Sequence, residues 1–233
     1  MIAVCLWRWG RLFGPEYVER TVSMLGRHLH LPHRVYCFTD DPNSLPRDVI
    51  PMPIPRDLVY TPRCRRRMWQ YNAEVDATLG RRLLSIDLDV VITGDITPLV
   101  ARPAPIVMWR VGYAGVLSGS FVLWDAGALH GAWAAYVAEP ERFPRRAQPA
   151  GIGSDQAMLN RWLQDSRTPV VELTEARDGF VTWFGAGYSE QERHGMGPGR
   201  PDLPPGARLV VLGSADKAVL DDGRYPWVKE HWR

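Results

Sequence analysis

The chain has 233 residues, 45% of them hydrophobic, which suffices for a sizeable core and is most simply read as one large α/β domain. A formal net charge of +2 gives no indication of a nucleic-acid partner. The three cysteines (Cys5, Cys37 and Cys64) have no CxxC spacing, which suggests a reducing compartment. There is no charged leader before the first apolar run and no apolar run long enough to span a bilayer. We therefore expect a cytoplasmic protein without a transmembrane segment.

The first part of the chain alternates strands with a helix. Residues 2–7 read as a buried strand, a helix with an apolar face begins at Pro15, and residues 34–38 form a second strand. Strand, helix and strand in such a short stretch are typical of the βαβ unit of a parallel sheet. No GxGxxG motif accompanies the unit, so the sequence does not indicate the usual dinucleotide site.

Three residues at the ends of these strands are candidates for holding a nucleobase. Trp7 could stack on a base, while Thr39 and Asp40 could contact its polar groups. The alternative is that Trp7 belongs to the core and Asp40 is an ordinary turn residue.

The proline-rich residues 42–62 are expected to cross the surface with one short strand, and the arginine run RCRRR at 63–67 then opens a helical segment that reaches about residue 79. Such a run is usually a solvated helix face. Because it leads directly into the next strand, one of its arginines could contact a phosphate, and we take Arg66 as the candidate.

The stretch RRLLSIDLDVVIT at residues 81–93 is the one around which the chain is organised. A short apolar strand ends in Asp87-Leu88-Asp89, and side chains two apart on an extended segment point to the same face, about 7 Å apart. Two carboxylates so close repel each other, so either one binds a proton or a cation lies between them. Mg²⁺ or Mn²⁺ accepts carboxylate oxygens, and ligands of open α/β sheets gather at the carboxyl ends of strands. We predict a metal site here; the alternative is that both acids solvate a turn or cap the next element.

The second half continues the alternation. Strands are expected at residues 106–111, 121–124, 170–173, 180–183 and 208–212, with a helix at about 128–138 and an amphipathic helix that follows from residues 151–156 and ends near residue 163. A stretch of small residues (Gly115, Ser118, Gly119 and Ser120) could let the backbone approach a ligand closely. Ser154 or Asp155 is a good helix N-cap. Residues 142–150 are expected to form a loop, residues 190–205 a mobile lid, and residues 225–233 a charged, aromatic tail.

The segment LSIDLDVVITGDITPL resembles the DxD segment of GT-A-fold glycosyltransferases, particularly the family 8-like nucleotide-sugar transferases. Four further segments fit the same pattern in the same order: WRWGRLFGPEYVERTV, RVYCFTDDP, GSDQAMLNRWL, and LPPGARLVVLG followed by YPWVKEHW. The resemblance covers nearly the whole chain. It implies a single GT-A-like domain with a Rossmann-like mixed, mostly parallel sheet flanked by helices. Residues 1–100 would form the nucleotide-binding half that ends in the DxD, and residues 101–233 the acceptor and sugar half.

The resemblance also assigns roles to individual residues. It implies that Asp87 and Asp89 hold a metal, usually Mn²⁺, against a nucleotide diphosphate; that Trp7, Thr39 and Asp40 contact the nucleoside, usually uridine; that Ser118, Gly119 and Ser120 line the sugar site; that Asp155 and Gln156 lie beside the donor sugar as the catalytic pair; and that Lys217 meets the diphosphate.

One feature departs from that pattern. Relatives often carry a histidine metal ligand at the end of the last strand, where this chain reads Val210-Val211-Leu212-Gly213. Leucine cannot coordinate a metal, so the affinity for the ion should be weaker or another ligand should replace the histidine. His231 in the tail is the candidate.

The expected function is therefore the metal-dependent transfer of a sugar from a nucleotide diphosphate sugar, a UDP-sugar by the resemblance, to an unknown acceptor, with retention of configuration. One alternative is a phosphohydrolase of the haloacid dehalogenase type, whose nucleophile motif is matched by residues 87–91. Such enzymes normally start with that strand, whereas here other elements precede it. A second alternative is a nucleotide-sugar-binding protein with weak or no turnover, which the missing histidine would explain.

Overall fold

A computed structural model of the chain describes residues 1–61, 63–112, 114–140, 154–184, 195–212, 217–221 and 223–233. The described residues form a seven-stranded sheet of order β3-β2-β1-β4-β7-β6-β8 (the large sheet) and a three-stranded sheet of order β5-β10-β9 (the small sheet). The strands of the large sheet are β1 (Ile2–Arg8), β2 (His33–Thr39), β3 (Val49–Pro53), β4 (Arg82–Ile86), β6 (Ile106–Val111), β7 (Val116–Asp125) and β8 (Val171–Leu173). Those of the small sheet are β5 (Val90–Ile92), β9 (Phe180–Trp183) and β10 (Leu209–Leu212).

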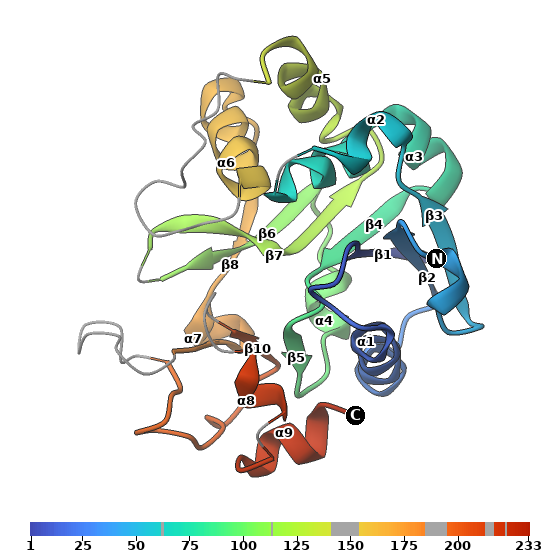
Figure 1. Ribbon diagram of the computed structural model, residues 1–233. Helices are drawn as coiled ribbons and strands as arrows, with labels where there is room; N and C mark the ends of the chain where they lie inside the picture. Colours follow the sequence, from blue (N-terminus) through green and yellow to red (C-terminus); the bar gives the residue numbers. More distant parts are fainter. Residues whose placement is uncertain (62, 113, 141–153, 185–194, 213–216, 222) are drawn as a thin grey trace.

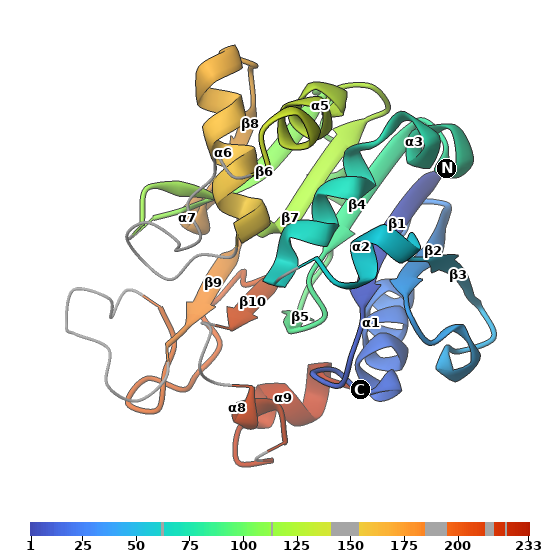
Figure 2. The same ribbon diagram turned by 45° about the horizontal axis from the view of Figure 1, so that its top comes forward.

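Helices lie on both faces of the large sheet (Figure 1). The α-helices are α1 (Pro15–His28), α2 (Arg56–Val59), α3 (Ala73–Leu79), α4 (Thr97–Val100), α5 (His130–Ala138), α6 (Ser154–Ser166), α7 (Glu175–Asp178), α8 (Ala218–Asp221) and α9 (Pro226–His231). The 3-10 helices are η1 (Pro42–Ser44) and η2 (Arg63–Tyr71). In Figure 2, α1 lies on one side of the sheet and α3, α5 and α6 on the other.

The large sheet is mixed and mostly parallel, as the sequence predicts. Strands β3, β2, β1 and β4 run parallel to one another, β7 pairs antiparallel with β4 and β6, and β8 is parallel to β6. The predicted βαβ unit is β1-α1-β2, and α1 begins at Pro15 as expected. The structure thus confirms an α/β fold with a mixed sheet flanked by helices.

The alternation of side chains along β1 explains why residues 2–7 of this strand are all apolar. Ile2, Val4 and Leu6 point into a core shared with α1, whereas Ala3, Cys5 and Trp7 point into a second core shared with η2, α3, α5 and α6. A strand buried on both faces needs apolar side chains on both, so its sequence reads as a continuous hydrophobic run.

Two expectations about the elements are corrected. The strand expected at residues 121–124 begins earlier, at Val116, so residues 118–120 of the small-residue stretch lie within β7, which is held between β4 and β6 by backbone pairing on both sides. The aromatic tail is largely the helix α9. The expected loop at 142–150, its continuation at 151–153 and the first part of the expected lid at 190–205 lie outside the described residues.

The C-terminal helix returns to the start of the chain. Arg27 near the end of α1 donates hydrogen bonds to the carbonyl oxygens of Arg233 (2.8 Å) and His231 (2.7 Å). This contact fixes α9 against α1, on the face of the large sheet that α1 covers (Figure 1). In the parts of the chain that the structure describes, every helix is too short or too polar to cross a membrane.

Candidate functional site

The DxD segment forms the connection between the two sheets. Strand β4 of the large sheet ends at Ile86, and β5 of the small sheet begins at Val90. Between them the chain turns, because the amide of Val90 donates to the carbonyl oxygen of Asp87 at 3.2 Å. The prediction of an extended geometry is therefore wrong, and a tight turn, not strand alternation, positions the two carboxylates.

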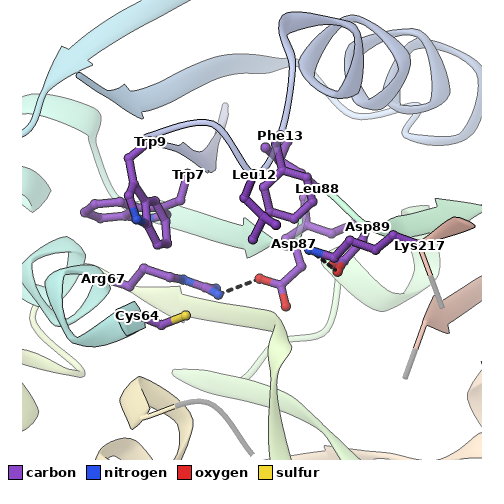
Figure 3. Close-up of a pocket in the computed structure, with 11 residues that line it drawn as sticks. Trp7, Trp9, Leu12, Phe13, Cys64, Arg67, Asp87, Leu88, Asp89 and Lys217 are labelled. Carbon is purple, nitrogen blue, oxygen red and sulfur yellow. Dashed lines mark hydrogen bonds and ion pairs between the residues drawn. The ribbon is translucent and has the colours of Figure 1, made fainter. Parts of the chain in front are cut away.

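Asp87 and Asp89 both line one cavity of about 170 Å³. The other lining residues are Trp7, Trp9, Leu12, Phe13, Cys64, Arg67, Ile86, Leu88 and Lys217. Figure 3 shows the two indoles on one side of this cavity, the Asp89–Lys217 pair on the other, and Arg67 and Asp87 between them. The predicted metal ligands thus face a shared cavity at the carboxyl end of a central strand.

Arg67 is the buried cation of the site. Its Nη1 donates to Asp87 Oδ1 at 2.6 Å, and its Nε forms an ion pair with Asp155 Oδ2 at 3.3 Å. Its Nη2 donates to the carbonyl oxygen of Gly119 at 3.1 Å. One guanidinium therefore links η2 to the DxD turn, to β7 and to the first turn of α6.

Burial and charge oppose each other in this group. Burial alone would lower the pKa of Arg67, but the carboxylates of Asp87 and Asp155 raise that pKa above its ordinary value. Burial also raises the pKa of Asp155, with the Arg67 guanidinium acting in the opposite direction. Asp155 is only 7% exposed, so it depends on Arg67 as its counter-ion.

Asp89 is paired with Lys217. The ammonium nitrogen of Lys217 lies 3.5 Å from Asp89 Oδ2 and 3.7 Å from the centre of the Phe13 ring. Burial and the neighbouring charge of Asp87 raise the pKa of Asp89 to about 6, although Lys217 acts to lower it. The second acid of the motif thus carries unfavourable negative charge that a cation would stabilise.

The aromatic end of the cavity is built from Trp7 and Trp9. Trp7 is almost fully buried, stacks on Phe38 with ring centres 4.4 Å apart, and donates from Nε1 to Gln70. Trp9 meets it edge-on and lies under the guanidinium of Arg66, whose Cζ is 5.0 Å from the ring centre. Trp7 is therefore both a core residue and a cavity residue, and Trp9 is the more accessible ring.

Thr39 is the last residue of β2 and Asp40 follows it, but neither residue lines the cavity. Asp40 accepts hydrogen bonds from the backbone amide of Gly10, at 3.0 Å to Oδ2, and so holds the loop between β1 and α1. Thr39 is buried and accepts from the amide of Asp41 at 3.0 Å. Asp40 therefore shapes the loop that carries Trp9 and Phe13, whereas Thr39 shapes the turn after β2.

The predicted sugar-site residues lie together beside the cavity and do not line it. The side-chain oxygen of Gln156 accepts from the amide of Gly119 at 2.9 Å, and the hydroxyl of Ser118 accepts from the amide of Ser120 at 3.1 Å. A Cβ at Gly119 would lie 3.4 Å from Cβ of Gln156, so β7 and α6 approach closely here. Asp155 and Gln156 thus join the start of α6 to β7 and to Arg67.

The structure does not bring His231 to the cavity. Its ring centre is 6.2 Å from that of His28, at the contact between α9 and α1. Burial lowers the pKa of His231. Leu212, at the end of β10, is a buried core residue.

The carboxylates of the cavity fit a divalent ion that takes its remaining ligands from water and a bound phosphate compound. In phosphate sites, Mg²⁺ typically uses one or two protein carboxylates and takes its other ligands from water and phosphate, and Asp87 and Asp89 provide such a pair. Within the described residues, no group of three or more His, Cys, Asp and Glu side chains could hold a metal. The residues therefore suit an ion that arrives with a diphosphate better than one held by protein ligands alone.

Several site residues were missed by the sequence analysis. Arg67, and not Arg66, contacts Asp87, and Arg65, Arg66 and Arg67 are all buried, at 6%, 8% and 8% exposure. The expectation of a solvated arginine face is therefore wrong. Trp9, Phe13 and Cys64 also line the cavity; burial and the charge of Asp155 raise the pKa of Cys64 to about 11. Only Trp9 had a signal in the sequence, its place directly after β1.

Comparison with known proteins adds no assignment: no protein-family model matches the chain, and no curated protein matches it.

Proposed function

We propose that this protein is a glycosyltransferase that moves a sugar from a nucleoside diphosphate sugar, with a UDP-sugar as the first candidate, to an acceptor hydroxyl. The observation that supports the proposal best is the composition of the cavity that Asp87 and Asp89 line. Indole rings line one side, Asp89 and Lys217 line the other, and Arg67 and Asp87 lie between them (Figure 3).

Each part of this cavity suits one part of such a donor. An aromatic face stacks on a nucleobase, which favours the side formed by Trp7 and Trp9 for the nucleoside. Arg67 and Lys217 can donate charge-assisted hydrogen bonds to diphosphate oxygens. The carboxylates of Asp87 and Asp89 would hold Mn²⁺ or Mg²⁺, which supplies Lewis-acid stabilisation of the diphosphate when bound.

The transfer itself requires stabilisation of the leaving group. The bond between the anomeric carbon and the diphosphate oxygen breaks, the electron pair stays on that oxygen, and the acceptor oxygen bonds to the anomeric carbon. Lys217 and Arg67 stabilise the negative charge that grows on the diphosphate. The acceptor proton passes to a base or to the diphosphate.

Asp155 has a different role in this proposal from the one that the resemblance implies. It is ion-paired to Arg67 and lies outside the cavity wall, so it orients the guanidinium and is a positioning residue. Gln156 holds the backbone of Gly119 next to the same guanidinium. Retention of configuration rests on the resemblance to the family 8-like transferases and is part of the proposal.

The proposal is tested by measuring UDP release from a panel of UDP-sugars with Mn²⁺, using wild-type protein, Asp87→Asn and Asp89→Asn. We expect release with at least one donor and a loss of about 100-fold or more in each variant, since one preorganised electrostatic group is typically worth that much. Asp165→Asn is the matched control, because Asp165 is an exposed partner of Arg161. Wild-type release by both DxD variants would refute the assignment.

The same samples address the two alternatives. Release of phosphate from a generic phosphomonoester that depends on Asp87, without UDP release, would favour the phosphohydrolase. Binding of UDP with neither hydrolysis nor transfer of any UDP-sugar would favour a nucleotide-sugar-binding protein.

A further inference from the structure

Lys217 occupies the position next to Asp89 that a metal ion would need. Its ammonium lies 3.5 Å from one oxygen of Asp89, and both side chains are about three-quarters buried, at 27% and 21% exposure. Lys217 reaches this position from the segment between β10 and α8, far along the chain from the DxD turn. The pair therefore already places one positive charge on the second acid of the motif.

We propose that Lys217 competes with the divalent ion for Asp89, so that the protein binds the ion weakly alone and strongly together with a nucleoside diphosphate. The inference rests on the proposed function, because it takes the diphosphate as the ligand of this cavity. An ammonium and a divalent ion repel each other, so each weakens the binding of the other to the same carboxylate. A diphosphate removes the conflict, since it gives Lys217 a new anionic partner and leaves Asp89 to the ion.

Phe13 contributes to this competition. Its ring centre lies 3.7 Å from the ammonium of Lys217, which is a cation–π contact made at the cavity wall. The ring stabilises the lysine where it contacts Asp89 (Figure 3). A smaller side chain at position 13 should therefore weaken the hold of Lys217 on Asp89 while the lysine itself remains.

The competition has a thermodynamic signature. If the diphosphate draws Lys217 away from Asp89, it raises the affinity for the ion, and by linkage the ion raises the affinity for the diphosphate by the same factor. Coupling between two ligands is typically about 5-fold to 150-fold. We expect about 10-fold or more here, and we expect most of it to disappear when Lys217 is replaced.

The test measures Mn²⁺ binding from the signal of free Mn²⁺ in electron paramagnetic resonance, with and without UDP. The proteins are wild type, Lys217→Met and Lys229→Met. Lys217→Met should bind Mn²⁺ alone about 10-fold more tightly than wild type, and it should bind UDP more weakly. Lys229 is the only other lysine of the chain and is exposed on α9, so Lys229→Met should behave as wild type. Mn²⁺ binding by Lys217→Met that equals or falls below wild type would overturn the inference.

Two further variants assign the effect. Phe13→Leu should raise the affinity for Mn²⁺ alone in the same direction by a smaller factor, and it provides the test if Lys217→Met does not fold. Adding Asp89→Asn to Lys217→Met should abolish the gain; a gain that persists would locate the ion elsewhere and contradict the inference. If UDP and Mn²⁺ bind cooperatively but Lys217→Met does not bind Mn²⁺ more tightly, the competition is wrong and the proposed function is unaffected. If Lys217→Met binds Mn²⁺ more tightly but the protein does not bind UDP, the competition holds and the proposed function is wrong.

Discussion

Arg67 and Asp155 form an ion pair inside the protein, with Nε 3.3 Å from Oδ2 and both side chains about nine-tenths buried. The pair joins η2 to the first turn of α6, on the face of the large sheet where these two elements lie. A buried carboxylate at this position is tolerated because the guanidinium lies beside it. Arg67 therefore stabilises the fold through Asp155, and the same contact fixes the position from which Arg67 reaches Asp87.

Replacing Arg67 with methionine should destabilise the fold strongly. The change leaves Asp155 buried without its partner, and breaking a buried ion pair from one side typically costs about 3–5 kcal/mol. Urea-induced unfolding measures the loss. Arg161→Ala is the control, because Arg161 forms an exposed pair with Asp165 and should cost less than about 1 kcal/mol. The double variant Arg67→Met, Asp155→Asn should be less destabilised than Arg67→Met alone; a loss below 1 kcal/mol in Arg67→Met would contradict this account.

Two glycines should respond to alanine in opposite directions. Gly26 is exposed inside α1, and a Cβ there meets no atom within 4 Å, so Gly26→Ala should stabilise the protein by about 0.5–1 kcal/mol. Gly179 ends α7 with a φ of +76°, and a Cβ there would lie 2.4 Å from the carbonyl oxygen of Gly206. Gly179→Ala should therefore destabilise by about 2 kcal/mol or more. Thermal unfolding measures the change in melting temperature of each variant. Changes of the same sign would contradict the prediction.

Trp9 should matter for nucleotide binding more than for stability. Its ring is half-buried and lines the cavity, and stacking of a base on an aromatic ring is worth about 1–3 kcal/mol. Trp9→Ala should weaken UDP binding by about 10-fold or more, as measured by calorimetry, while Trp9→Phe should retain most of the affinity. Trp7→Ala, by contrast, should cost about 3–5 kcal/mol of stability, because Trp7 is packed on Phe38 in the core. Unchanged UDP affinity in Trp9→Ala would place the base elsewhere.

The raised pKa of Asp89 predicts a pH dependence of stability. The folded protein holds the proton of Asp89 up to about pH 6, whereas the unfolded chain releases it near pH 4. Between these values the folded state binds more protons, so stability falls as pH rises. Asp89→Asn cannot titrate, so it should become more stable relative to wild type, by about 1 kcal/mol or more, as pH rises from 4 to 7.

The comparison is made by urea unfolding at several pH values without added metal. Asp165→Asn, at an exposed position, should show no such trend relative to wild type. A stability difference between Asp89→Asn and wild type that stays constant over this range would show that Asp89 titrates normally.

The sequence predicts the β1-α1-β2 unit well because its signals are local. Residues 2–7 of β1 face two apolar cores in alternation, and Pro15 fixes the first turn of α1. The same is true of the placement of Asp87 at the end of a buried strand. These features depend on periodicity and on residues that are close together in the chain.

The contacts of the arginine run could not be predicted in this way. The charges of Arg66 and Arg67 are stabilised by partners such as the ring of Trp9 and the carboxylates of Asp87 and Asp155, which only the complete fold brings to η2. A local charge pattern gives no information about such partners, so the run read as a solvated face. The turn at Asp87 was missed for a related reason, because β5 belongs to a second sheet whose other strands come much later in the chain.

The turn between β4 and β5 depends on a strand from late in the chain. Strand β5 is at the edge of the small sheet, and within the described residues its partner there is β10. A protein shortened before β10 would leave β5, and with it one side of the Asp87–Val90 turn, without its hydrogen-bonded partner. Residues 1–100 are therefore not a self-sufficient module: they carry the acidic motif, but the last quarter of the chain has to be in place before that motif acquires its shape.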